Sequence, residues 1–174
     1  RMLFATVSHG FSPPKLEETL LPEGIINTDI KPETGWNYEI GSRGKLLKKI
    51  INYELSLYVM DIDNLLVPRR TGDDQFVGVN AGKTLHKGME ISLNYFILDK
   101  KSIQLSHSNS FSYQNFKFQE FEDLDQDYSG NDLTGVPDKT FFSELFLNSS
   151  SGFYTYLNYQ YTGQIPITDD NSVY

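Results

Sequence analysis

Long runs of alternating apolar and polar residues constrain this chain more than any other feature. In residues 51–60 (INYELSLYVM) every odd-numbered side chain is apolar or aromatic, and the even-numbered ones include Asn52, Glu54 and Ser56. Successive side chains of an extended strand point to opposite faces, so this run predicts a strand with one apolar face. Helical spacing is scarce, and only residues 15–21 are expected to form a short helical turn. The alternation predicts an all-β, antiparallel chain.

Seven strands can be placed between turn signals. They span residues 2–10, 36–47, 50–67, 76–98, 103–121, 140–148 and 153–163, and the last residues would begin an eighth. The connections alternate between long or medium (11–35, 68–75, 122–139) and tight (48–49, 99–102, 149–152). In an up-and-down meander every second connection lies at the same end of the sheet. Long loops at one end and tight turns at the other are typical of outer-membrane barrels, and a sandwich has no need to sort its loops.

Composition and charge exclude several classes of protein. The chain has no cysteine, so disulfides, thiolate metal sites and cysteine nucleophiles are excluded. Its net charge of −8 argues against nucleic-acid binding, which needs clustered Lys and Arg. No apolar run is long enough for a transmembrane helix, and the first residues do not form a signal peptide. The start at Arg1 and the loop-like end at Tyr174 indicate a segment of a longer protein.

The apolar face has two possible environments, because a soluble β-sandwich also hides one face of each sheet. The apolar residues lie next to the tight turns, and the far halves of the strands become polar or charged, as at Asp61, Lys83 and Lys87. About ten residues of a tilted strand cross a bilayer, whereas the strand predicted at 76–98 is far longer. We therefore expect a segment of a transmembrane β-barrel with lipid on its apolar face. The alternative is a soluble β-sandwich that acts as a binding module, for example for carbohydrate.

Three motifs resemble the C-terminal barrel portion of TonB-dependent outer-membrane receptors. They are SHGFSPP (residues 8–14), DIKPETGWNYEIGSRG (29–44) and VNAGKTLHKGMEISLNY (79–95). The second is similar to the family's Leu-Lys-Pro-Glu run followed by Asn-Tyr-Glu-x-Gly, and the third to its Asn-Ala-Gly pattern followed by Gly-x-Glu. Order and spacing also match, and with the meander the resemblance covers nearly the whole chain.

This resemblance implies a larger antiparallel barrel that encloses an N-terminal plug in the outer membrane of a Gram-negative bacterium. It implies uptake of a scarce ligand, such as a ferric siderophore, haem, cobalamin or a glycan, with energy from the TonB complex. Residues 1–174 are then expected to be a partial barrel in which the plug is missing, so TonB would act through a part outside this segment. The segment by itself is not expected to transport.

Two groups of residues are candidates for a functional site. Glu39, Glu54 and Glu90 project to the polar side of their predicted strands, where a lumen would tolerate carboxylates that lipid would not. We expect them to form hydrogen bonds within the wall or to a plug before any contact with a ligand. Arg69 and Arg70 are predicted in an external loop, where they are candidates for contact with an anionic siderophore or a lipopolysaccharide phosphate. A solvated loop is the simpler interpretation of these two arginines.

No catalytic, metal or cofactor site is expected, and the chain is predicted not to be an enzyme. The acidic stretch from Asp123 to Asp132 is spaced like the start of a calcium loop, but Tyr128 and Thr134 replace the required Gly and Glu. It is therefore predicted to be a solvated loop, with adventitious calcium as the alternative. The histidines lie on different predicted strands without ligand spacing, and residues 149–151 form a serine-rich turn without a nucleophile elbow.

An isolated sheet of this kind would have two free edges and an uncovered apolar face. Such surfaces favour association through both the edges and the face. The segment alone is therefore expected to self-associate or to curl on itself.

Overall fold

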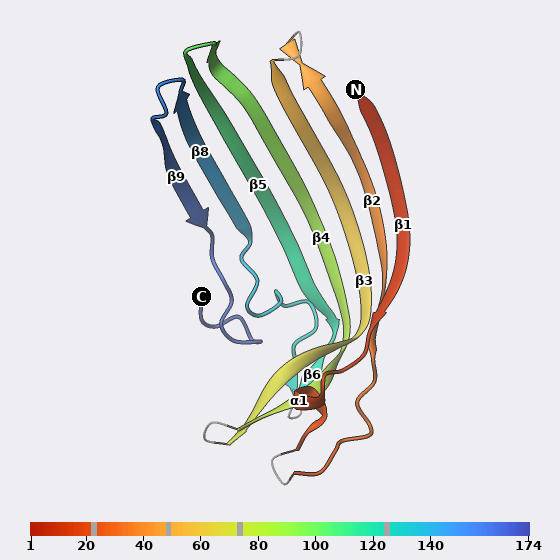
Figure 1. Ribbon diagram of the computed structural model, residues 1–174. Coiled ribbons are helices and arrows are strands. Elements are labelled where there is room, and N and C mark those ends of the chain that lie inside the picture. Colours follow the sequence, from red (N-terminus) through yellow and green to blue (C-terminus); the bar gives the residue numbers. More distant parts are fainter. Residues whose placement is uncertain (22–23, 48–49, 73–74, 124–125) are drawn as a thin grey trace.

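The computed structural model describes residues 1–21, 24–47, 50–72, 75–123 and 126–174, with the side chains of residues 17, 68–76 and 81 left aside. Seven strands form one curved antiparallel sheet in the order β1-β2-β3-β4-β5-β8-β9, so each strand lies beside its neighbour in the chain (Figure 1). This order confirms the predicted all-β, up-and-down meander. The strands are β1 (Met2–Ser12), β2 (Glu33–Leu46), β3 (Ile51–Gly72), β4 (Gln75–Lys100), β5 (Ile103–Glu120), β8 (Lys139–Ser149) and β9 (Tyr154–Thr162).

Two smaller elements lie in the long connections. The helical turn α1 (Leu16–Thr19) follows β1, as the sequence predicts, and strands β6 (Glu122–Asp123) and β7 (Gln126–Asp127) form a separate two-stranded ribbon after β5. In the described part of the chain, no helix is long and apolar enough to cross a membrane.

The connections are sorted as expected, with the tight turns at the upper end in Figure 1 and the long connections at the lower end. One predicted loop is wrong. Residues 68–75 were expected to connect two strands, but β3 and β4 pair up to Gly72 and Gln75. The predicted connection begins at Pro68, which does not end the strand. The proline is tolerated because β3 pairs with β2 only as far as Asp63 and is an edge beyond that point.

The register gives the sheet two chemically different faces in the half near the tight turns. Leu57 lies opposite Ile40 of β2 and Met89 of β4, while its neighbour Ser56 lies opposite Glu90. Since side chains alternate, each row continues across the sheet on one face. We define the uncharged face by a set of residues on the side of Leu57 that contains no Asp, Glu, Lys or Arg: Leu3, Ala5, Val7, Tyr38, Ile40, Ser42, Tyr53, Leu55, Leu57, Val59, Met89, Ile91, Leu93, Tyr95, Leu105, His107, Asn109, Phe111, Phe141, Ser143, Leu145, Leu147, Thr155, Leu157, Tyr159 and Tyr161. Lysines lie on the same side at its borders, Lys87 and Lys139 toward the loops and Lys100 at a tight turn.

The opposite side, which we call the charged face, carries the carboxylates of Glu39, Glu54, Glu90 and Glu144 and the guanidinium of Arg43. Most of its other residues in this half are serines, asparagines, threonines or aromatic residues. One side of the sheet thus carries Asp, Glu, Lys or Arg only at its borders, whereas the other carries carboxylates and a guanidinium in its middle, so the two faces suit different environments.

Two aromatic rings of the charged face lie over glycines on the neighbouring strand. Phe4 is directly opposite Gly41, and Tyr58 is directly opposite Gly88. A Cβ atom at Gly88 would overlap the Tyr58 ring, and one at Gly41 would overlap the Phe4 ring and lie 2.7 Å from the Leu55 carbonyl oxygen. The close approach of the ring therefore requires glycine at both positions.

The loop end contains the small apolar core of the described structure. Phe118 is 1% exposed and packs with Phe121 and Leu133, so the connection after β5 folds back onto that strand. Partly buried residues complete this cluster: Leu65, Val67, Phe116, Tyr128 and Val136. This packing fixes the long connection between β5 and β8 against the sheet.

Candidate functional site

The middle of the charged face holds a cluster of hydrogen-bond acceptors. Ser56 is 7% exposed, lies directly opposite Glu90, and donates its hydroxyl to Glu39 Oε1. Tyr58 is opposite Glu39 and completes the group. These side chains, with Asn37 and Met60, line a shallow depression of about 270 Å³. Two carboxylates and a phenol in an open depression supply hydrogen-bond acceptors and negative charge, which suits contact with a polar surface.

Glu54 lies on the same face, nearer the tight turns. It is directly opposite Arg43 on β2 and Ser92 on β4. The Arg43 guanidinium lies over the Phe4 ring at 5.8 Å from its centroid, a cation–π geometry. The register thus places Glu39, Glu54 and Glu90 on one face, as the sequence alternation predicts. A contact of these residues with ligand stays a prediction.

Arg69 and Arg70 lie in strand β3, opposite Val77 and Phe76, and not in a loop as expected from the sequence. The cause is the continued pairing of β3 with β4 beyond Pro68. The arginine side chains are outside the described part of the structure. In chain position they lie at the far end of the β3–β4 hairpin, remote from Glu39, Glu54 and Glu90. Their role in ligand contact remains a prediction.

The three histidines lie on separate strands and have different surroundings. His9 packs on Trp36 with ring centroids 4.7 Å apart. His86 is 6% exposed and stacks on Phe116 at 4.2 Å. Among the described side chains, no group of three or more His, Asp or Glu residues could hold a metal ion. In the acidic stretch, Asp125 is outside the described residues, and Asp127 caps a turn by accepting from the Ser129 amide at 2.9 Å.

Polar side chains on the uncharged face bond to one another, which the sequence alone does not reveal. Tyr95 Oη and Ser143 Oγ lie 2.7 and 2.8 Å from the two ring nitrogens of His107. Ser42 Oγ and Tyr53 Oη form a second pair at 2.8 Å. A neutral imidazole that accepts from Tyr95 at Nδ1 and donates to Ser143 from Nε2 satisfies both of its nitrogens. These groups therefore need no water, although they lie on a surface without protein cover.

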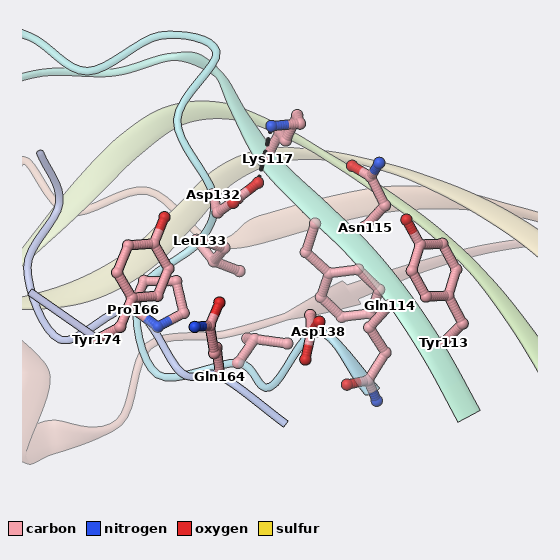
Figure 2. Close-up of a pocket in the computed structure, with 12 residues that line it drawn as sticks. Tyr113, Gln114, Asn115, Lys117, Asp132, Leu133, Asp138, Gln164, Pro166 and Tyr174 are labelled. Atoms are coloured by element: carbon pink, nitrogen blue, oxygen red, sulfur yellow. Dashed lines mark hydrogen bonds and ion pairs between the residues drawn. The ribbon is translucent and has the colours of Figure 1, made fainter. Parts of the chain in front are cut away.

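The loop end contains a cavity of about 310 Å³ beside β5 (Figure 2). Two hydrogen bonds, Leu133 N to Phe116 O and Gln114 N to Asp138 O, attach the following segment to β5. The segment is longer between these bonds (residues 133–138) than the strand is (residues 114–116). Between them the segment after β5 bulges away from the strand, and the C-terminal segment closes the other side. Sequence reasoning missed it because it depends on packing between distant segments. Its lining residues are Tyr113, Gln114, Asn115, Phe116, Lys117, Asp132, Leu133, Val136, Asp138, Gln164, Pro166 and Tyr174.

The charges in this cavity are largely neutralised. Lys117 Nζ lies 2.7 Å from Asp132 Oδ1 (Figure 2). Lys139 Nζ, beside the cavity, lies 3.4 Å from Asp138 Oδ2. Gln114 Oε1 is buried and has no hydrogen-bond partner among the described residues. The cavity is thus a small polar recess with paired ions.

Two asparagine side chains hold the long connections in place, Asn80 from strand β4 and Asn171 from the segment after β9. Asn80 accepts from Lys31 N at 2.9 Å and donates to Lys31 O at 3.0 Å. The Asn171 side chain forms the same pair of hydrogen bonds with the Asp132 backbone: its Oδ1 accepts from the Asp132 amide at 2.7 Å and its Nδ2 donates to the Asp132 carbonyl at 2.9 Å. Each amide thus replaces the backbone partner that a strand would supply. Next to Asn171, hydrogen bonds from the Thr168 hydroxyl and from Ser172 lower the pKa of Asp170.

Long antiparallel strands, one uncharged and one charged face, and loops sorted to one end define a section of the wall of a β-barrel. A family model described as the TonB dependent receptor-like beta-barrel matches residues 1–174, and the chain belongs to this family. Its members are outer-membrane transport receptors of Gram-negative bacteria.

Solved structures agree with this fold. The sheet is similar to the copper transporter OprC, with a TM-score of 0.67 and 16% identity over 92% of this chain and 23% of that chain. It is also similar to the RagAB peptide transporter, with a TM-score of 0.61 and 14% identity over 92% of this chain and 26% of that chain. At these identities the likeness shows the fold, and the chain spans about a quarter of either transporter.

Proposed function

We propose that this chain is part of the wall of an outer-membrane receptor that takes up a scarce ligand with energy from TonB. The uncharged face carries the argument. A surface that carries no Asp, Glu, Lys or Arg between its borders, and on which Tyr95, His107 and Ser143 bond to one another, suits an environment that cannot hydrate polar groups. An unpartnered polar group in hydrocarbon costs several kcal/mol, whereas water would make the mutual bonding unnecessary. In this proposal the uncharged face contacts lipid.

The charged face would then line the lumen. Glu39, Glu54 and Glu90 are acceptable there because a wet or plug-filled interior supplies donors. We propose that these glutamates form hydrogen bonds within the barrel wall or to the plug. Arg69 and Arg70, at the end of the β3–β4 hairpin, are the proposed contacts for an anionic ligand. TonB would act through the plug.

The ligand class stays open among ferric siderophores, haem, cobalamin and glycans, as the family resemblance implies. The two similar structures are a copper transporter and a peptide transporter, so one fold serves chemically different ligands. Loops and plug, more than the wall, would select the ligand.

Deletion of the gene for the full-length protein tests this function. We expect the deletion strain to lose uptake, and therefore growth, on one scarce nutrient from a panel of iron chelates, haem, cobalamin and oligosaccharides. A plasmid copy should restore growth in a TonB-positive strain and fail to do so in a strain without TonB. Full rescue without TonB would contradict energised uptake.

The isolated segment offers a second test. Residues 1–174 leave β1 and β9 as free edges beside an uncovered apolar face, and such surfaces associate. We propose that the segment forms oligomers or aggregates in water and disperses in detergent micelles. Sedimentation velocity measures the difference, and a stable monomer in water would favour the soluble sandwich over the barrel wall.

A further inference from the structure

Basic residues gather at the tight turns, although the chain as a whole is acidic. Residues 43–54 and 98–106 form two of the three tight turns and the strand ends beside them. They contain two acidic residues, Glu54 and Asp99, and six basic ones: Arg43, Lys45, Lys48, Lys49, Lys100 and Lys101. The net charge of the chain is −8, so the loop end carries the excess of carboxylates. Arg43 and Lys45 point to the charged face, so we call only Lys100 and Lys101 the basic edge.

The basic edge is not neutralised within the described structure. The ion pairs among the described residues involve Lys83, Lys117 and Lys139, which all lie in the half of the sheet nearer the loops. No carboxylate of the described residues lies within ion-pair distance of the basic edge. Asp99, the nearest in sequence, accepts a hydrogen bond from Gln104 Nε2 at 2.9 Å. These cations are therefore free to meet an anion from outside the chain.

The uncharged face leads directly to the basic edge. Lys100 pairs with Ile103, and the β-bulge after Phe96 brings Leu98 opposite Leu105 on the same side. Both Lys100 and Lys101 are exposed. A lysine at the border of an apolar surface extends its methylene groups along that surface and places its ammonium group beyond it. In a lipid leaflet this border is the level of the headgroup phosphates.

We propose that the basic edge binds the phosphates of anionic phospholipids in the leaflet that meets the tight turns. This inference rests on the proposed function, since it requires lipid against the uncharged face. That contact also selects a phospholipid over a soluble polyanion, which the acidic loops and the net charge of −8 would repel. Each lysine close to an anionic surface is expected to raise lipid affinity about fivefold at low salt.

The full-length protein in phosphatidylcholine vesicles, with and without phosphatidylglycerol, provides the test. Spin-labelled phosphatidylglycerol and phosphatidylcholine report, by electron paramagnetic resonance, the relative association of each lipid with the protein perimeter. We expect the wild type to favour phosphatidylglycerol several-fold, with a preference that falls as salt rises. The double variant K100Q/K101Q should lose most of this preference.

The matched control removes the same charge at the opposite end. Lys15 and Lys31 are exposed residues of the connection between β1 and β2, and K15Q/K31Q should keep the wild-type preference. Equal association of both lipids with the wild type, or an unchanged preference in K100Q/K101Q, would overturn the proposal. Failure to insert into either kind of vesicle would overturn the proposed membrane function as well, and is separately visible as the absence of any immobilised lipid.

Discussion

Replacing Gly88 with alanine is expected to lower the free energy of unfolding of the full-length protein by about 1–3 kcal/mol, the usual cost of overpacking. The new methyl group would occupy the position of the Tyr58 ring, which lies directly over this glycine. The ring would have to leave its place beside Glu39 and Glu90. Urea unfolding of the protein in a defined bilayer, followed by tryptophan fluorescence, measures the change.

A double-mutant cycle separates this contact from a general effect of alanine. In the background of Tyr58→Ala, Gly88→Ala should cost almost nothing, because the three atoms nearest to the added Cβ all belong to Tyr58. Gly10→Ala on β1 is the control, since a Cβ there meets no atom within 4 Å. Its effect should be neutral or stabilising by a few tenths of a kcal/mol. Additive effects of Gly88→Ala and Tyr58→Ala would contradict the packing described.

Replacing Leu157 with arginine is expected to destabilise the protein in a bilayer by about 2–4 kcal/mol, as for a charge in the lipid-facing surface of a barrel. Leu157 is 70% exposed on the uncharged face, so the larger side chain meets no steric obstacle. Any cost must therefore come from the environment of that face. Reversible unfolding in vesicles gives the difference.

Asn158→Arg is the matched control, because Asn158 is the next residue of β9 and points to the charged face. It lies opposite Glu144, which would favour the new cation, and it is exposed. We expect a change within about 0.5 kcal/mol for this surface substitution. Equal effects of the two arginines would show that both faces meet the same solvent and would contradict the proposal that the uncharged face contacts lipid.

The main sheet follows from local features of the sequence. Alternation and turn signals predict seven strands within a few residues of their observed ends, because each tight turn forces its strands to pair. The β3–β4 hairpin shows the limit of this reasoning. The predicted strand ends before Pro68, yet pairing with β4 continues to Gly72, because a proline is tolerated where the other edge of the strand is free.

Contacts across several strands could not be predicted from sequence. The hydrogen bonds that link Tyr95, His107 and Ser143 require the register of three strands. The bulge after Phe96 moves Leu98 into the row that strict alternation would give to Ile97. The cavity beside β5 and the clamp from Asn171 to Asp132 join segments about 40 residues apart. In contrast, the shared face of Glu39, Glu54 and Glu90 needs only alternation.

The rings over glycine have a consequence for assembly of the sheet. A register shift of one residue moves every side chain of the strand to the opposite face, which is unfavourable because charged groups would then meet lipid and apolar groups would meet water. An error of two residues keeps every side chain on its proper face, so alternation gives no protection against it. Such an error would put Tyr58 over His86 or Glu90 in place of Gly88, and Phe4 over Glu39 or Arg43 in place of Gly41. Because each ring fits closely only over its glycine, the two contacts favour the native register of their strand pairs over a register shifted by two residues.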